Sequence, residues 1–430
     1  MKIFFAIINC HAQNARAIAL FFLLITLPLA GCATGKPATV VDTAPTRGHA
    51  LPQAEPEDTA SPQPIPMVML YQTDATPGMF EPEDGVYLGA WLREYTTLRD
   101  FEIATGRRHA VYVHEMQLGD PAPIHWLLEC ISNMATPLII IHPPAPTEHE
   151  EEPPNLEEKI ETLAHRLGLI NLPMFIAFYP PGHGLGAPDF TLLFNQARAI
   201  FNWEAPLAAF VWVAPSLNVT PRNPFFPGHN SVDWVAVSLL AARAAEGLAN
   251  DILADFEDFY MNFAPSAPIA ILPLGISHFS RIDHVYHVHC AAAEIKRVYS
   301  SLGTAFPRVG LIIYGDNNIL TPRSSNDFSL TLDPCITDAY RQAIDSGRFV
   351  TQLDRATHPT HNQRWSRSAY SGYYQGGNLY LPAAALESLG LTPPRQTHEI
   401  NGGIYVNIST LTRPEITFCT SSKVIFIHGH

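Results

Sequence analysis

The chain has 430 residues, of which 47% are hydrophobic and only 15% are charged, and it contains 38 prolines. This length allows two domains and a sizeable core, because single domains commonly have roughly 100–200 residues. The formal charge of −14 becomes more negative when a leader carrying Lys2 and Arg16 is removed, which argues against nucleic acid and anionic lipid as electrostatic partners.

Residues 1–31 are predicted to be a signal peptide. Two cationic residues precede an apolar run over residues 17–30, which is too short for a comfortable membrane span. The run ends in Leu29-Ala30-Gly31-Cys32, which resembles the lipobox of bacterial lipoproteins. That resemblance implies acylation of Cys32 and a membrane-anchored protein on the extracytoplasmic face. Several acyl chains on one cysteine give anchoring that a single chain cannot. The alternative is a cysteine that follows an ordinary cleavage site by coincidence.

Residues 32–66 are rich in Ala, Thr, Pro, Asp and Glu and have no apolar period, so they are predicted to form a disordered tether. Four cysteines follow, and their three possible pairings stay open. No CxxC motif occurs, and the histidines of 284–289 are interpreted as polar residues of a helix face. We therefore expect no metal and no cofactor.

Residues 67–326 are predicted to form a (β/α)8 TIM barrel. Continuous apolar runs are typical of strands that are buried on both faces, and here they alternate with helical patterns. The eight predicted strands are Val86–Ala90, Ala110–Val113, Pro137–Ile141, Met174–Phe178, Ala209–Val213, Val232–Val237, Ile269–Leu272 and Val309–Tyr314.

From residue 327 to residue 430 the pattern changes to short strands and helices of one or two turns, which predicts a small α+β accessory domain. The hairpin signals are Gly376-Gly377-Asn378 and Asn401-Gly402-Gly403. The segment from Tyr373 to Ile427 resembles the copper amine oxidase N-terminal-like domain, which implies a stalk-like module on a bacterial surface. The resemblance implies no copper site.

The barrel segment resembles family 26 glycoside hydrolases, the β-mannanase type. The resemblance is carried by Gly85-Val-Tyr-Leu-Gly-Ala-Trp91, by Phe210-Val-Trp-Val-Ala-Pro215 with Phe226-Pro-Gly-His-Asn-Ser-Val-Asp-Trp-Val235, and by Arg308-Val-Gly-Leu-Ile-Ile-Tyr314. It implies a retaining mechanism, which uses two carboxylates about 5–5.5 Å apart, one as acid/base and one as nucleophile.

The sequence departs from that family at both catalytic positions. Pro181 replaces the fourth-strand glutamate and Pro273 the seventh-strand glutamate, so neither proton transfer nor nucleophilic attack is available there. Glu115 and Asp316 follow other predicted strands and are the candidates for displaced catalytic carboxylates. The alternative interpretation is that both are loop charges or helix caps.

Aromatic and polar side chains at strand ends remain suited to holding a sugar, because rings stack on its C–H faces. The alternative for each is core packing. The candidate carbohydrate-binding residues are Trp91, Tyr179, His183, Trp212, His229 and Tyr314.

The sequence therefore predicts a lipid-anchored, glycosidase-like barrel that binds polysaccharide or cell-wall polymer without cleaving it. Two other hypotheses stay open: an active retaining glycosidase that uses displaced carboxylates, and a structural envelope lipoprotein.

Overall fold

The structure is a computed structural model. It describes residues 63–143, 155–178, 185–244, 247–248, 251–321, 324–353, 363–388, 396–409 and 416–428. The predicted leader, nearly all of the predicted tether, Cys32, Tyr179, Pro181 and His183 lie outside these residues. No helix within the described ranges has the length and apolar character that a membrane crossing needs.

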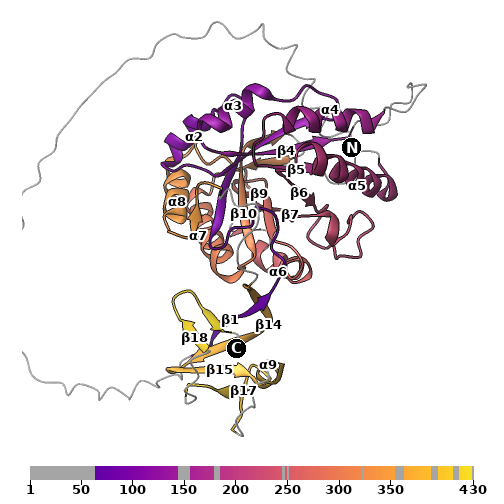
Figure 1. Ribbon diagram of the computed structural model, residues 1–430. Coiled ribbons are helices and arrows are strands. Elements are labelled where there is room, and N and C mark those ends of the chain that lie inside the picture. Colours follow the sequence, from indigo (N-terminus) through magenta and orange to yellow (C-terminus); the bar gives the residue numbers. More distant parts are fainter. Residues whose placement is uncertain are drawn as a thin grey trace, which may run out of the picture. The chain divides into compact units, whose positions relative to one another are not determined.

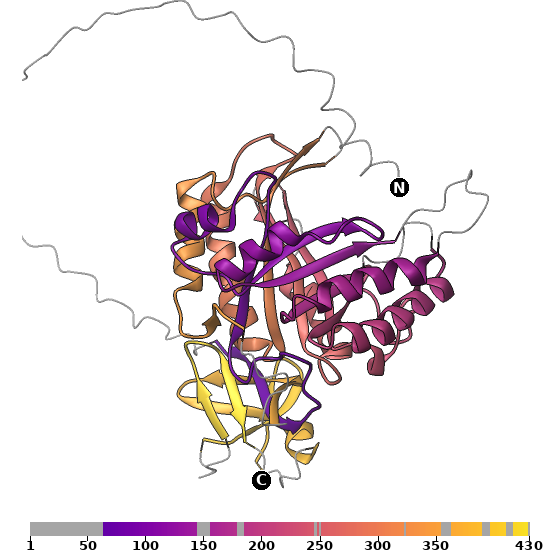
Figure 2. The ribbon, with the colours of Figure 1, turned by 45° about the horizontal axis from the view of Figure 1, so that its top comes forward.

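Eight parallel strands form the closed (β/α)8 barrel that the sequence predicts (Figures 1 and 2). They follow one another around the ring in chain order, and β10 closes it by pairing with β2 from Leu311 opposite Tyr87 to Asp316 opposite Leu92. The barrel strands are β2 Val86–Leu92, β3 Val111–Gln117, β4 Thr136–His142, β5 Met174–Phe178, β6 Ala208–Val213, β7 Trp234–Ala244, β9 Ile269–Ser280 and β10 Val309–Asp316.

Helices cover the outside of the barrel. Side-chain caps fix where several of them begin, as where Asn155 accepts a hydrogen bond from the Glu158 backbone and Asp251 from that of Leu253. The helices are α2 Leu98–Thr105, α3 Ile124–Ser132, α4 Leu156–Gly168, α5 Ala187–Glu204, α6 Ile252–Phe263, α7 Val288–Ala305 and α8 Pro334–Ile344. Short elements lie between them: the 3-10 turn His229–Ser231, β8 Gly247–Leu248, β11 Asn318–Thr321, β12 Ser324–Asp327 and β13 Phe349–Val350.

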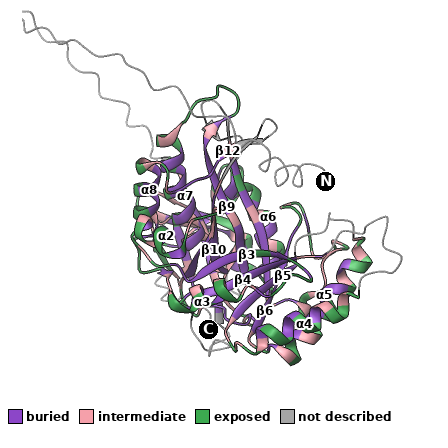
Figure 3. Cartoon of the chain, turned by 90° about the horizontal axis from the view of Figure 1, so that it is seen from above, coloured by how far each residue is buried: buried purple, intermediate pink, exposed green. Residues whose placement is uncertain are grey.

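The barrel has two apolar layers, one on each face of its strands. Figure 3 shows that the strands are buried along most of their length. Side chains inside the ring, such as Val111, Ile140 and Phe175, form one cluster. Side chains on the other face of the same strands, such as Tyr112 and Ile139, pack against the helices in a second and larger cluster. Successive strand residues point to opposite faces, so membership of a cluster shows which way each residue faces.

A second sheet forms the C-terminal module. Its strand order is β16-β17-β15-β14-β1-β19-β18. Its elements are β1 Ile65–Asp74, β14 Gln363–Gln375, β15 Asn378–Pro382, α9 Ala383–Ser388, β16 His398–Ile400, β17 Gly403–Asn407, β18 Ile416–Cys419 and β19 Val424–Ile427. Both predicted hairpins are present, and the positive φ of Gly376, Gly377, Asn401 and Gly402 matches the two-residue turns that suit twisted strands.

Two segments group differently from the sequence-based division. Strand β1, which was expected with the barrel, pairs antiparallel with β14 and parallel with β19. Helix α8, which was expected in the accessory module, buries Ile336 and Tyr340 in the outer cluster of the barrel. The reason is that both segments find their partners by packing and pairing over long sequence separations, which local patterns do not reveal.

Candidate functional site

Three neighbouring strands present side chains toward the mouth of the barrel, the end where (β/α)8 proteins carry their sites. On β2, β3 and β4 the inward positions include Tyr87, Val113 and Ile140, which belong to the interior cluster. Further along the same inward faces stand Trp91, Glu115 and His142. Trp91 is partly buried and packs against the interior cluster, so its ring borders the mouth.

Glu115 and His142 form a pair at this mouth. Oε1 of Glu115 lies 3.3 Å from Nε2 of His142, and the two side chains are 39% and 18% exposed. A carboxylate held by an imidazole and still open to solvent can accept hydrogen bonds from a ligand hydroxyl. His142 was not among the residues predicted from sequence. No sequence motif marks it, and its inward orientation follows from its place two residues after Ile140, which the structure places inside the ring.

Asp316 does not share this position. It is fully buried, and its Oδ1 accepts a hydrogen bond of 2.6 Å from the backbone N–H of Leu330. Nε of Arg93 lies 3.5 Å from its other oxygen. Burial raises the pKa of Asp316, against the lowering effects of the Leu330 hydrogen bond and the Arg93 charge. The Leu330 hydrogen bond fastens the segment that follows β12 to the end of β10, so Asp316 has a structural role.

The two carboxylates therefore do not face each other. Glu115 and Asp316 are the only acidic residues on the described barrel strands. Glu115 has the inward orientation of Val113, whereas Asp316 has the outward orientation of Tyr314, and β2 lies between their strands. A retaining glycosidase needs two carboxyl groups on opposite sides of one bond. The described strands do not provide that pair.

Pro273 occupies the position on β9 where the family resemblance places one glutamate. Its ring packs against the backbone of the neighbouring strand, since a Cβ built on Gly315 of β10 would lie 3.2 Å from Cβ of Pro273. This contact fills the space beside the strand end with a side chain that can neither donate a proton nor attack carbon.

Trp212 and Tyr314 lie in the core. Both are fully buried in the layer between strands and helices. The Trp212 ring packs 4.8 Å from Phe226 and 5.6 Å from Phe263, measured between ring centroids. The Tyr314 hydroxyl accepts a hydrogen bond from the Ile276 backbone, and burial raises its pKa. Neither ring has an exposed face on which a sugar could stack, because both are packed between strands and helices.

His229 is exposed in the 3-10 turn that follows β6, and its ring lies 5.0 Å from that of Phe226. Three strands separate β6 from the β2 that carries Trp91. The structure thus brings Trp91 and Glu115 to one side of the mouth and places His229 on another side of it.

No group of three or more metal-ligand side chains occurs in the described part of the chain. In the segment singled out in the sequence, Nε2 of His287 lies 2.9 Å from Asp283, and Nδ1 of His289 lies 3.5 Å from the Cys335 sulfur. These are separate pairs.

No protein-family model and no curated protein sequence matches the chain. Solved structures that resemble it include a family 26 β-mannanase from Bacteroides ovatus, which is 9% identical. This likeness covers 65% of this chain and 95% of that one, with a TM-score of 0.44. Cel5A from Thermotoga maritima, solved with mannotriose, is 10% identical over 61% of this chain and 99% of that one, with a TM-score of 0.42. A family 53 catalytic domain from Ignisphaera aggregans is 13% identical. This likeness covers 63% of this chain and 98% of that one, with a TM-score of 0.41. Likenesses this distant concern the barrel fold and carry no inference about substrate.

Proposed function

We propose that this protein is a lipid-anchored, extracytoplasmic member of the glycosidase-like barrels that binds carbohydrate or cell-wall polymer and does not cleave it. The binding site in this proposal is the barrel mouth around Trp91, Glu115 and His142. The lipid anchor in this proposal is Cys32, which lies outside the described residues.

One observation carries the loss of cleavage. The described barrel strands hold two carboxylates, and these face opposite sides of the barrel wall. Positioned proton transfer alone contributes about 10²–10⁴-fold to such reactions. Because the described barrel strands hold no second carboxylate across the mouth, we expect the covalent route to be lost as well.

The binding part of the proposal is supported by the chemistry of the mouth. Trp91 offers an aromatic edge anchored in the interior cluster, and the pair of Glu115 and His142 offers hydrogen-bonding atoms to solvent. Sugar recognition combines these two kinds of group, because a pyranose has apolar C–H faces and a rim of hydroxyls.

The test is a titration of the full chain with mannohexaose, xylohexaose and cellohexaose, followed by product analysis. We expect binding of at least one hexaose and release of no shorter sugar. Changing Glu115→Gln or Trp91→Ala should weaken binding by about tenfold or more, since a truncated central contact typically costs that much.

Glu399→Gln is the matched control, because it makes the same carboxylate-to-amide change at an exposed position on β16 of the other sheet. Sustained sugar release that disappears in Glu115→Gln would contradict the proposal and support an active hydrolase. Failure of every hexaose and of cell-wall material to bind would favour a structural envelope protein.

A further inference from the structure

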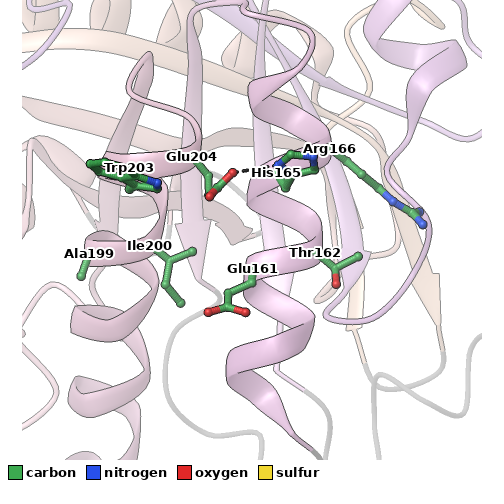
Figure 4. A pocket seen from close by; sticks show the side chains of 8 residues that line it. All are labelled: Glu161, Thr162, His165, Arg166, Ala199, Ile200, Trp203 and Glu204. Atoms are coloured by element: carbon green, nitrogen blue, oxygen red, sulfur yellow. Dashed lines mark hydrogen bonds and ion pairs between the residues drawn. The ribbon is translucent and has the colours of Figure 1, made fainter.

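A hollow of about 690 Å³ lies on the outer surface of the barrel between α4 and α5 (Figure 4). Its lining residues are Glu161, Thr162, His165, Arg166, Ala199, Ile200, Trp203 and Glu204. Arg166 is in the last turn of α4, and Glu204 is the last residue of α5. Barrel helices run back from the mouth, so the hollow lies toward the opposite end and is separate from the Trp91 site.

Trp203 dominates one wall of the hollow. It is 85% exposed, although the same helix buries Phe194, Ala197 and Phe201 against the barrel. Trp203 comes two residues after Phe201, which turns it about 200° away from the buried face. The fold therefore leaves an indole, with its large apolar faces, in water. Covering such a face is favourable for any ligand that has a matching apolar surface.

Polar groups lie to one side of the indole, between α4 and α5 (Figure 4). Nδ1 of His165 on α4 lies 2.8 Å from Oε2 of Glu204 on α5, which ties the two helices together across the hollow (Figure 4). Glu161 is exposed and makes no ion pair or side-chain hydrogen bond to another described residue, and the Arg166 side chain extends away from α5 (Figure 4). The hollow thus combines an acceptor that has no partner among the described residues with a prearranged pair, both beside one aromatic ring.

We propose that this hollow is a second carbohydrate-binding site, which takes a chain of neutral hexose units. The indole would stack on the C–H face of one ring, while Glu161 and the His165–Glu204 pair bind hydroxyls. The mixture of acidic and basic side chains gives no single sign of charge to select an ionic ligand. The volume lies within the range of about 300–1,000 Å³ that is usual for such sites.

This inference goes beyond the proposed function, because it concerns residues on helices and not the mouth. A protein with two such sites would bind a long polymer more tightly than a hexaose, since the second contact becomes intramolecular. The two sites can be tested apart, because no residue is shared between them.

The experiment is isothermal titration of the full chain with mannohexaose, xylohexaose and cellohexaose, in the wild type and in Trp203→Ala. We expect two bound hexaoses per wild-type chain and one per Trp203→Ala chain, a loss of about tenfold or more in affinity at that site. Trp203→Tyr keeps a stacking ring and should keep most of the binding. Leu192→Ala is the control, because Leu192 is 59% exposed on the same helix and does not line the hollow.

The outcomes separate the two proposals. If Trp203→Ala binds every hexaose as the wild type does, the second site is refuted, whatever Glu115→Gln does. If Trp203→Ala loses binding and Glu115→Gln does not, the second site stands and the proposed mouth site falls. If none of the three hexaoses binds at millimolar concentration, the second site is refuted too. A thermal melt of each variant checks that the exposed substitutions leave the fold intact.

Discussion

At the scale of single residues, the face of a strand decides which aromatic can meet a ligand. Trp91 and Glu115 face into the barrel, whereas Trp212 and Tyr314 face the helices. The sequence could not show this, because strands of a parallel barrel are apolar on both faces and the period of two is hidden. It did identify Trp91 and Glu115 as strand-end residues, and it missed His142 because a lone histidine at the end of an apolar run gives no motif.

His109 provides a prediction about pH at the same scale. It is fully buried just before β3, its Nε2 lies 2.8 Å from Oη of Tyr340, and burial lowers its pKa to about 3. An unfolded chain protonates this histidine near pH 6.5 while the folded chain does not, so folding becomes less favourable as the pH falls below about 6.5. At pH 5 the loss from this group should be about 2 kcal/mol.

Urea unfolding at pH 7.5 and pH 5 measures this loss. His109→Phe keeps an aromatic ring beside Phe101 and Tyr340 but cannot be protonated. The difference in unfolding free energy between the two pH values should shrink by about 2 kcal/mol in the variant. His125→Phe makes the same change at an exposed histidine on α3 and is the control. An equal pH dependence in wild type and His109→Phe would show that the buried ring becomes protonated in the folded state.

At the scale of elements, the sequence predicted the strands and turns that local residue patterns determine. All eight barrel strands were found, and Met174–Phe178 was predicted with its observed bounds, because continuous apolar runs between turn residues are a local signal. The glycine turns of the second sheet were predicted for the same reason. The pairing of β1 with β14 and β19 was missed, since its partners lie about 300 residues or more away along the chain.

The element grouping leads to a prediction about fragments. The two barrel clusters draw all of their buried residues from 79–353, and the cluster of the second sheet draws its own from β1 and residues 379–427. A fragment of residues 76–353 should therefore unfold in one cooperative transition. A fragment of residues 67–326 lacks α8 and loses the burial of Ile336, Tyr340 and Ile344, worth about 1.5–3 kcal/mol for each large apolar side chain.

Thermal and urea melts of the two fragments decide the point. The 67–326 fragment should be the less stable by several kcal/mol, or should fail to fold, because Tyr299 and Tyr314 lose the ring of Tyr340 that packs against them. Equal stability of the two fragments would show that α8 is an accessory helix and would restore the boundary near residue 326.

At the scale of the whole molecule, the proposed role depends on where the protein is held. A protein that binds an insoluble polymer and does not cut it would act by holding that polymer in place. The lipid anchor proposed for Cys32 would hold the polymer close to the membrane. A polymer bound at both proposed glycan sites would be held at two points of one barrel, which raises avidity without any new contact. The proposed role in holding a polymer therefore needs the membrane anchor as well as the two glycan sites.

The anchor is tested by changing the acylated residue. Cys32→Ser removes the thiol that would carry the lipid, so the protein should move from the membrane fraction to the soluble fraction, because no acyl chain remains to partition into the bilayer. Cys10→Ser is the matched control: it makes the same change upstream of the predicted cleavage site and should leave the distribution as it was. Metabolic labelling with a palmitate analogue should mark the wild type and Cys10→Ser, and not Cys32→Ser. Membrane association and labelling that both survive in Cys32→Ser would rule out the lipoprotein anchor, and would leave the two glycan sites to be explained in a protein held by other means.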